Sequence, residues 1–448
     1  MTCLWFDSAL LPDGWASSVR LTLADGLIAR VETDTAPAAG DERGLAAVPG
    51  VGNLHSHAFQ RAMAGLAETV TPQGGDDFWS WREVMYRFVA RLTPDDVEAI
   101  AAQAYAEMLE SGFTRVGEFH YLHHDVDGTA FADPAEMAQR IVAAAGQTGI
   151  GLTLLPVFYA HAGFGGESPA PFQQRFIHSL ETFGPLLDRS RRGLHTLKDG
   201  VLGLAAHSLR AVTPAQLAEL VALAGPDPIH IHIAEQAREV SDCLAWSGQR
   251  PVAWLLDHAP VDARWCLVHA THMDSVEAAA LAKSGATAGL CPITEANLGD
   301  GLFPASDYLA HGGQFGIGSD SNVLIDLAEE LRLLEYGQRL MAEARGRLGS
   351  GADLFKHAHR GGARALGVAN PGLTAGASAD IVSLDINHPA LTAKAGDLLL
   401  DGWIFAARRG AVETVWRRGE RVVDGGRHVR ADAIGRRYRR ALAKVLAR

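Results

Sequence analysis

Histidines and a carboxylate recur at the ends of apolar runs in this 448-residue chain, and their types suit metal-assisted hydrolysis. His55 and His57 are separated by one residue, so on a β-strand both imidazoles point to the same side. His232, His269 and Asp320 each close a later apolar run. Three imidazoles and one carboxylate suit Zn²⁺ or Fe²⁺ with a water molecule in an open position. The spacing therefore predicts one metal centre, if the fold brings the ends of these runs together.

Spacing does not decide which histidine of the run 228–233 would bind the metal. His230 and His232 alternate with isoleucines, so both could face the same side, and spacing does not choose between them. Glu235 follows, where a carboxylate could reach a metal-bound water as a general base. The alternative interpretation is a glutamate in the first turn of a helix, favoured there by the helix dipole.

The elements that must position these residues are eight short apolar runs. Their near-continuous apolar character is typical of parallel strands buried on both faces. Helical patterns lie between most of them; two begin with Thr-Pro pairs at Thr93 and Thr213. The alternation predicts a (β/α)₈ barrel, an α/β fold whose active sites lie at the carboxyl ends of the strands. The runs are 51–57, 114–121, 152–159, 201–207, 228–233, 264–270, 286–291 and 314–320.

The two ends of the chain differ from this middle part. Residues 1–48 and 372–430 contain short alternating strands with glycine turns, and we expect them to pair into one composite β-sandwich. The barrel then covers residues 49–371. Residues 431–448 read as a basic amphipathic helix that docks on the acidic body or on a second subunit, and we expect a homodimer.

Composition excludes several classes of protein. The net charge of −12 argues against nucleic acid as a partner, although residues 401–448 are locally basic. The four cysteines form no CxxC pair, which argues against a disulfide framework or a cysteine zinc site. No apolar run reaches the roughly 20 residues that a membrane span needs, and the N-terminus lacks the basic region of a secretory signal. We expect a cytoplasmic enzyme with no membrane partner.

The strand-end motifs together resemble the amidohydrolase superfamily, in its mononuclear aminohydrolase branch. The matching features are HxH on the first strand, HxxE on the fifth, His on the sixth and SD on the eighth. The resemblance implies one zinc ion per subunit, with iron possible, bound by His55, His57, His232 and Asp320. It also implies that Glu235 is the proton shuttle, that His269 hydrogen-bonds the attacked centre, and that Asp320 helps to activate water.

A longer run, Asn53 to Gly65, narrows this resemblance to deiminases that act on a linear amidine with two carboxylates. Such a small dicarboxylate needs local cations inside an acidic protein, and guanidinium groups bind carboxylates in a bidentate manner. For each arginine, a surface ion pair is the competing interpretation. The resemblance favours five substrate contacts: Gln60, Arg82, Tyr121, His207 and Arg210.

Two other functions are compatible with the sequence. A deaminase of a cyclic amidine such as guanine or cytosine would need aromatic stacking and amide contacts in place of several arginines. A barrel without catalytic activity could bind nucleic acid through the basic C-terminal segment. The insertion at 59–92 and the glycine-rich segment 161–170 could each close over a bound substrate.

Overall fold

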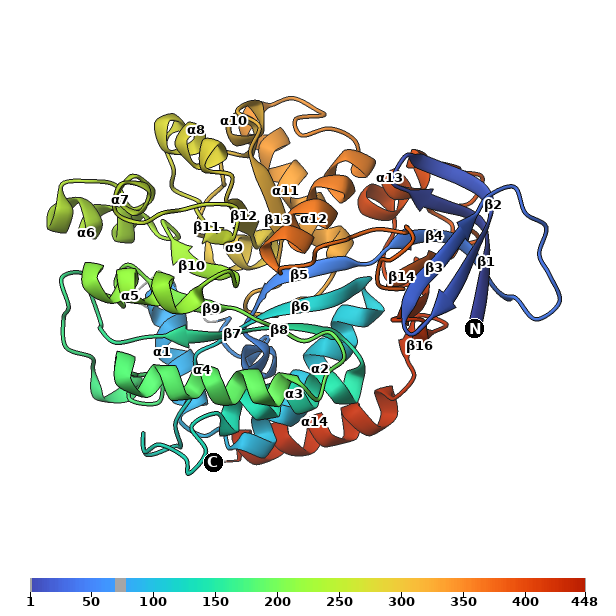
Figure 1. The fold of residues 1–448 in the computed structure, drawn as a ribbon. Helices are drawn as coiled ribbons and strands as arrows, with labels where there is room; N and C mark the ends of the chain where they lie inside the picture. The colour runs from blue at the N-terminus through green and yellow to red at the C-terminus, as the bar shows by residue number, and fades with distance from the viewer. Residues whose placement is uncertain (1, 69–77, 448) are drawn as a thin grey trace.

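Eight parallel strands form a barrel at the centre of the molecule, in a computed structural model that describes residues 2–68 and 78–447 (Figure 1). Around the barrel they are β5 (Val51–Ser56), β6 (Phe113–His120), β7 (Gly151–Phe158), β9 (Leu204–Ser208), β10 (Ile229–Ile233), β11 (Trp265–His269), β12 (Thr287–Leu290) and β13 (Gln314–Ile317); a short β8 (Val201–Leu202) pairs with β7. The ring closes beyond β13, where the Asp320 N–H donates to the His55 carbonyl at 3.0 Å and the His57 N–H donates to the Asp320 carbonyl at 2.9 Å.

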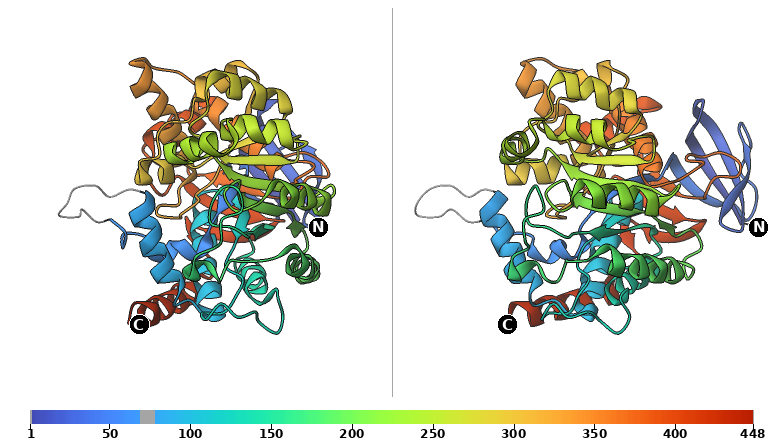
Figure 2. Two further views of the ribbon diagram at one scale, coloured as in Figure 1. Left: turned by 90° about the vertical axis from the view of Figure 1, so that its left-hand side faces the viewer. Right: turned by 60° about the vertical axis from the view of Figure 1, so that its left-hand side comes forward.

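Helices cover the outside of the barrel and follow most of its strands (Figures 1 and 2). They are η1 (Ala58–Met63), α1 (Phe78–Val89), α2 (Pro94–Glu110), α3 (Glu136–Thr148), η2 (Pro171–Gln173), α4 (Leu180–Leu194), α5 (Pro214–Ala224), α6 (Ala237–Ser247), α7 (Pro251–His258), α8 (Ser275–Ser284), α9 (Pro292–Leu298), α10 (Ala305–Ala310), α11 (Leu327–Ala342) and α12 (Gly351–Ala365). Thr93 and Thr213 are the N-caps of α2 and α5, as predicted, each followed by proline.

Helix α12 packs across the amino-terminal halves of β5 and β13. A Cβ atom on Gly361 would lie 1.9 Å from the Phe315 carbonyl oxygen, and one on Gly362 would lie 2.8 Å from that of Gly52. Glycine therefore permits this close approach of helix and strands, because any side chain would collide with backbone. The opposite ends of the strands stay open for the functional site.

Strands from both termini build a second sheet beside the barrel (Figure 2, right). Its order is β17 (Arg427–His428), β16 (Glu420–Asp424), β15 (Val412–Arg417), β14 (Ile381–Leu384), β4 (Glu42–Pro49), β1 (Thr2–Leu11), β2 (Gly14–Ala24) and β3 (Leu27–Glu32). The N- and C-terminal strands meet where β14 pairs antiparallel with β4. Helix α13 (Asp397–Ala406) connects β14 to β15. The predicted fold class, a barrel with a β-structure made by both termini, is confirmed.

The basic C-terminal segment forms α14 (Ala431–Leu446), which lies along α2 of the same chain (Figure 1). Lys444 pairs with Asp96 at 3.0 Å, and Arg437 pairs with Glu98 at 2.9 Å. Part of the local positive charge is thus neutralised within the chain. In the described part of the chain, no helix is both long and apolar enough to span a membrane.

Candidate metal and substrate site

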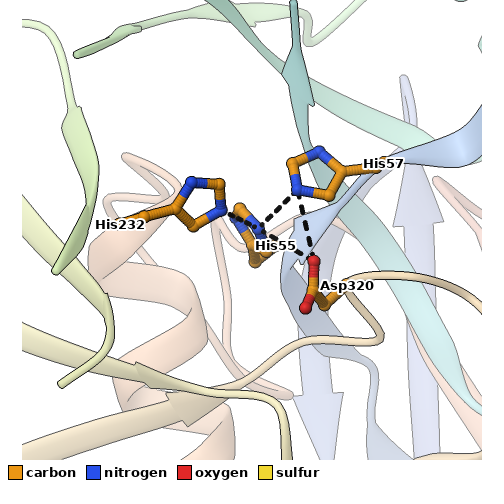
Figure 3. Close-up of side chains that lie close together, drawn as sticks. All are labelled: His55, His57, His232 and Asp320. Carbon is orange, nitrogen blue, oxygen red and sulfur yellow. Dashed lines mark hydrogen bonds and ion pairs between the residues drawn. The ribbon is translucent and has the colours of Figure 1, made fainter. Parts of the chain in front are cut away.

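Three histidines and one aspartate converge at the carboxyl ends of β5, β10 and β13 (Figure 3). The Nε2 atom of His55 lies 3.2 Å from that of His57 and 3.0 Å from that of His232. The Asp320 Oδ1 atom lies 3.2 Å from His57 Nε2 and 3.4 Å from His55 Nε2. All four side chains are buried, and one ligand atom from each falls within 4.8 Å of the others. Nitrogen lone pairs and a carboxylate that face one point suit a divalent cation.

Hydrogen bonds behind this group fix the orientation of its members. The His57 Nδ1 atom lies 3.0 Å from the Phe119 carbonyl, which can only accept, so Nδ1 carries the hydrogen and Nε2 is free to bind a metal. The Asn322 amide donates to the carbonyls of His57 and Asp320, both at 3.0 Å. Asp320 and Asn322 have positive φ values of 42° and 55°, a strained conformation that these bonds maintain.

The position of His230 answers the question that spacing left open. Its Nε2 atom lies 2.8 Å from the carbonyl of Ala365, the last residue of α12. The ring therefore points toward the amino-terminal side of the barrel, away from the His/Asp group. His232 is the histidine of β10 that joins the His/Asp group.

Two further ionisable side chains lie beside the group. His269 Nε2 is 3.8 Å from both Glu235 Oε1 and Asp320 Oδ2, while its Nδ1 faces Glu295 at 3.2 Å. Burial lowers the pKa of His269, but the carboxylates of Glu235, Glu295 and Asp320 outweigh it and raise the pKa to about 10. Burial, with the nearby Asp320 and Glu239 charges, raises the pKa of Glu235 to about 7. A carboxyl group with a pKa near neutrality can both take and give a proton.

A pocket opens above these residues, and all five predicted substrate contacts line it: Gln60, Arg82, Tyr121, His207 and Arg210. The Gln60 amide donates to the Tyr121 hydroxyl at 2.8 Å, and the buried Gln60 Oε1 atom has no hydrogen-bond partner in the described part of the chain. Arg82 extends from α1 and donates to the Tyr86 hydroxyl at 2.7 Å. Arg210 follows β9, and its buried Nε also lacks a hydrogen-bond partner among these described residues. The pocket thus offers a hydrogen-bond acceptor, Gln60 Oε1, and a hydrogen-bond donor, Arg210 Nε, that the described residues leave unused. It also offers the guanidinium groups of Arg82 and Arg210.

Arg61, next to Gln60, points elsewhere. It forms an ion pair with Glu107 on α2 at 2.6 Å and does not line the pocket. Of the insertion at 59–92, residues 69–77 lie outside the described residues, whereas Phe78 and Trp81 on α1 form part of the pocket wall. In the segment 161–170, Phe164 stacks on Trp246 of α6 at 5.4 Å between ring centroids.

Sequence reasoning missed two buried glutamates next to the site. Glu295 accepts from the Cys291 N–H at 2.9 Å and holds His269, and Glu239 accepts from the backbone behind Glu235. Both occupy the first turn of a helix, α9 and α6. Glutamate is common in the first turn of a helix because of the helix dipole. The one sequence signal that could have marked Glu239 and Glu295 as site residues is their position shortly after the end of a strand.

Comparison with known proteins agrees with this geometry. The model of the amidohydrolase family matches residues 46–422. The chain belongs to the amidohydrolase family. A second model, the N-terminal domain of formimidoylglutamate deiminase HutF, matches residues 1–45. Within the amidohydrolase family, the chain is 52% identical to a formimidoylglutamate deiminase of Pseudomonas aeruginosa over the full length of both chains.

A further relative and two solved structures extend the comparison. A 5-methylthioadenosine/S-adenosylhomocysteine deaminase of Natronomonas pharaonis is 28% identical, over 91% of this chain and 89% of its own. The crystal structure of an amidohydrolase from Brucella melitensis superposes with a TM-score of 0.97 at 54% identity and covers all of both chains. An adenosine deaminase from Xanthomonas campestris with bound zinc has a TM-score of 0.82 at 23% identity, over 100% and 99% of the chains.

Proposed function

We propose that this amidohydrolase hydrolyses N-formimino-L-glutamate to N-formyl-L-glutamate and ammonia, a step of histidine degradation. The observation that carries the proposal is the pocket, in which Arg82 and Arg210 stand above the His/Asp group. Guanidinium groups match the two carboxylates of this substrate. The full-length relative from P. aeruginosa, a formimidoylglutamate deiminase, supports the same reaction.

The His/Asp group fits a single divalent metal, for which we propose zinc, with Fe²⁺ as the other candidate. His55, His57, His232 and Asp320 would hold it, because their ligand atoms already converge and the His57 Nδ1–H is engaged behind the site. A bound divalent ion lowers the pKa of its water to about 7. A second metal bridged by a modified lysine is not expected, since the fourth barrel strand, Leu204–Ser208, contains no lysine.

The protein side chains would then move protons around the attacked carbon. Glu235 accepts one proton of the attacking water, whose oxygen forms a bond to the formimino carbon as the C=N double bond becomes single, and passes this proton to the formimino nitrogen. Asp320 accepts the second proton from the same oxygen, and Glu235 relays it to the nitrogen. The C–N bond then breaks, ammonia leaves, and the oxygen becomes the formyl carbonyl of N-formyl-L-glutamate. His269, which faces both carboxylates at 3.8 Å, donates a hydrogen bond to the tetrahedral centre.

The five pocket residues would bind the rest of the substrate. We propose that Arg82 and Arg210 each bind a carboxylate, and that Gln60, Tyr121 and His207 donate or accept hydrogen bonds at the formimino end or a carboxylate. A cyclic amidine such as guanine or cytosine would leave both guanidinium groups without an anion, and the comparisons do not favour it.

Product analysis tests the proposed reaction. The purified protein, loaded with Zn²⁺, is incubated with N-formimino-L-glutamate while proton NMR follows the formimino and formyl signals and an enzymatic assay follows ammonia. One ammonia per formyl group formed is the expected result. Release of glutamate or formamide, or no turnover with zinc or with iron, would contradict the proposal.

A cytoplasmic location and a homodimer stay predictions. Arg437 and Lys444 of the basic helix α14 form ion pairs within their own chain. Three further arginines of this helix are exposed and could contact a second subunit: Arg436, Arg439 and Arg440.

A further inference from the structure

Glu239, on α6, joins two parts of the site that have different tasks. Its Oε1 atom accepts the backbone N–H of Ala234 at 3.2 Å, and its Oε2 atom accepts that of Glu235 at 3.3 Å. The same Oε2 atom lies 3.8 Å from Nη2 of Arg210. One carboxylate therefore contacts both the backbone that carries Glu235 and an arginine that lines the pocket.

Both of these contacts are buried. Glu239 is 1% exposed, and the side chain of Arg210 is 12% exposed. Arg210 is the one cation within ion-pair distance of Glu239 among the residues that the structure describes. A buried carboxylate is strongly unfavourable without such partners, so removal of either one disturbs the other.

The backbone that Glu239 holds is strained. Ala234 has a φ of 48°, in the left-handed region that residues other than glycine rarely adopt. This turn directs Glu235 toward His269 immediately after β10 ends at Ile233. The two hydrogen bonds to Glu239 maintain the turn, because they engage the buried N–H groups of Ala234 and Glu235 at once.

Among the residues that the structure describes, Arg210 has one ion-pair partner. Its Nη2 faces Glu239, whereas its Nε is buried and has no hydrogen-bond partner there. A planar guanidinium group fixed in this way offers a prepared donor edge to an anion that enters the pocket.

We propose that Glu239 is a positioning residue for two groups at once, Arg210, which binds one substrate carboxylate, and Glu235; this inference rests on the proposed function. Its carboxylate holds Arg210 ready for the anion and holds the strained turn that aims Glu235. Substrates without that carboxylate lose the grip of Arg210 but still meet a correctly placed Glu235.

Steady-state kinetics of Glu239→Gln, Arg210→Met and wild type test this double role on three substrates. They are N-formimino-L-glutamate, N-formimino-4-aminobutyrate, which lacks the α-carboxylate, and N-formimino-L-2-aminobutyrate, which lacks the side-chain carboxylate. Glutamine keeps the size of Glu239 but offers one oxygen to two N–H donors. Asp242→Asn, at an exposed position on the same helix, is the matched control.

We expect Arg210→Met to raise KM for one of the two analogues and not for the other, which identifies the carboxylate that Arg210 binds. Glu239→Gln should raise KM for N-formimino-L-glutamate and for that same analogue, and not for the analogue that lacks the carboxylate bound by Arg210. It should also lower kcat about 10- to 100-fold on all three substrates, since Glu235 is displaced. Metal content and melting temperature, measured on the same samples, show that the variants are folded and loaded.

Two results would overturn the proposal: kcat and KM within about twofold of wild type in Glu239→Gln, or a loss of kcat without the KM effect that Arg210→Met shows. The second is the pattern of a merely structural residue. If the wild type turns over none of the three substrates, the proposed function fails. The positioning of Arg210 by Glu239 is then tested by calorimetry with the three N-formyl compounds. Similar losses of binding affinity in Glu239→Gln and Arg210→Met support the proposal, and an unchanged affinity in Glu239→Gln contradicts it.

Discussion

At the scale of single residues, the proposed mechanism depends on Glu235. Replacing it by glutamine keeps the shape but removes the carboxylate that we propose takes and gives the proton. We expect Glu235→Gln to lower kcat about 10²- to 10⁴-fold while metal content stays that of wild type. Kinetics with metal analysis measure this, and Glu219→Gln, at an exposed position of α5, is the matched control. A kcat near the wild-type value would remove Glu235 from the mechanism.

The raised pKa of Glu235 also sets a pH dependence. Burial raises this pKa to about 7, so the carboxylate that accepts the proton of water is lost as the pH falls below that value. We expect kcat/KM to fall about tenfold per pH unit on the acidic side of pH 7 and to level off above it. A pH profile with a midpoint near the ordinary glutamate value would show that another group controls the reaction.

At the scale of elements, α12 shows how packing fixes the barrel. Gly361 lies against the Phe315 carbonyl with no room for a side chain, so Gly361→Ala forces helix and strand apart. We expect the variant to lose about 1–3 kcal/mol of unfolding free energy. Gly184→Ala in α4 meets nothing within 4 Å and should gain up to about 1 kcal/mol. Thermal unfolding distinguishes them, and equal melting temperatures would refute the packing argument.

The same element marks a limit of prediction from sequence. The barrel strands were predictable because each is a short run that is buried on both faces, as the entirely buried β6 and β7 illustrate. Helix α12 was not predicted, since paired glycines disfavour a helix by propensity and only the close contact with β5 and β13 explains them.

Residues 171–179, just before α4, are the opposite case, a helical sequence pattern that the fold does not follow. A helical pattern extends through 172–188, but α4 begins only at Leu180, after the N-cap Ser179. The preceding segment is held by buried Arg175, which donates to the Val89 and Leu92 carbonyls. Tertiary hydrogen bonds outweigh the local pattern here.

Local sequence patterns likewise predicted some residues of the site and not others. His55 and His57 share one strand face whatever the rest of the fold does, whereas the choice between His230 and His232 depends on depth inside the barrel. Glu239 and Glu295 act through contacts with residues of other elements, which no local pattern reveals.

At the scale of the whole molecule, a metal held by the buried His/Asp group would tie function to stability. Ligands that bind only the folded state stabilise it, by about 4 kcal/mol at a free metal concentration of 1,000 times Kd. We expect dipicolinate treatment to abolish ammonia release and to lower the melting temperature, and Zn²⁺ or Fe²⁺ to restore both. Calorimetry and activity on the same samples measure this; full activity in metal-free protein would contradict the metal assignment.

The most direct test of the central claim is a comparison of kcat/KM for three substrates with one preparation of metal-loaded protein. Ammonia release is measured with N-formimino-L-glutamate, guanine and cytosine under identical conditions. The site predicts efficient turnover of the formimino dicarboxylate, with kcat/KM at least about 10⁴ M⁻¹s⁻¹, and no measurable turnover of either cyclic amidine. Preferential deamination of guanine or cytosine would contradict the account.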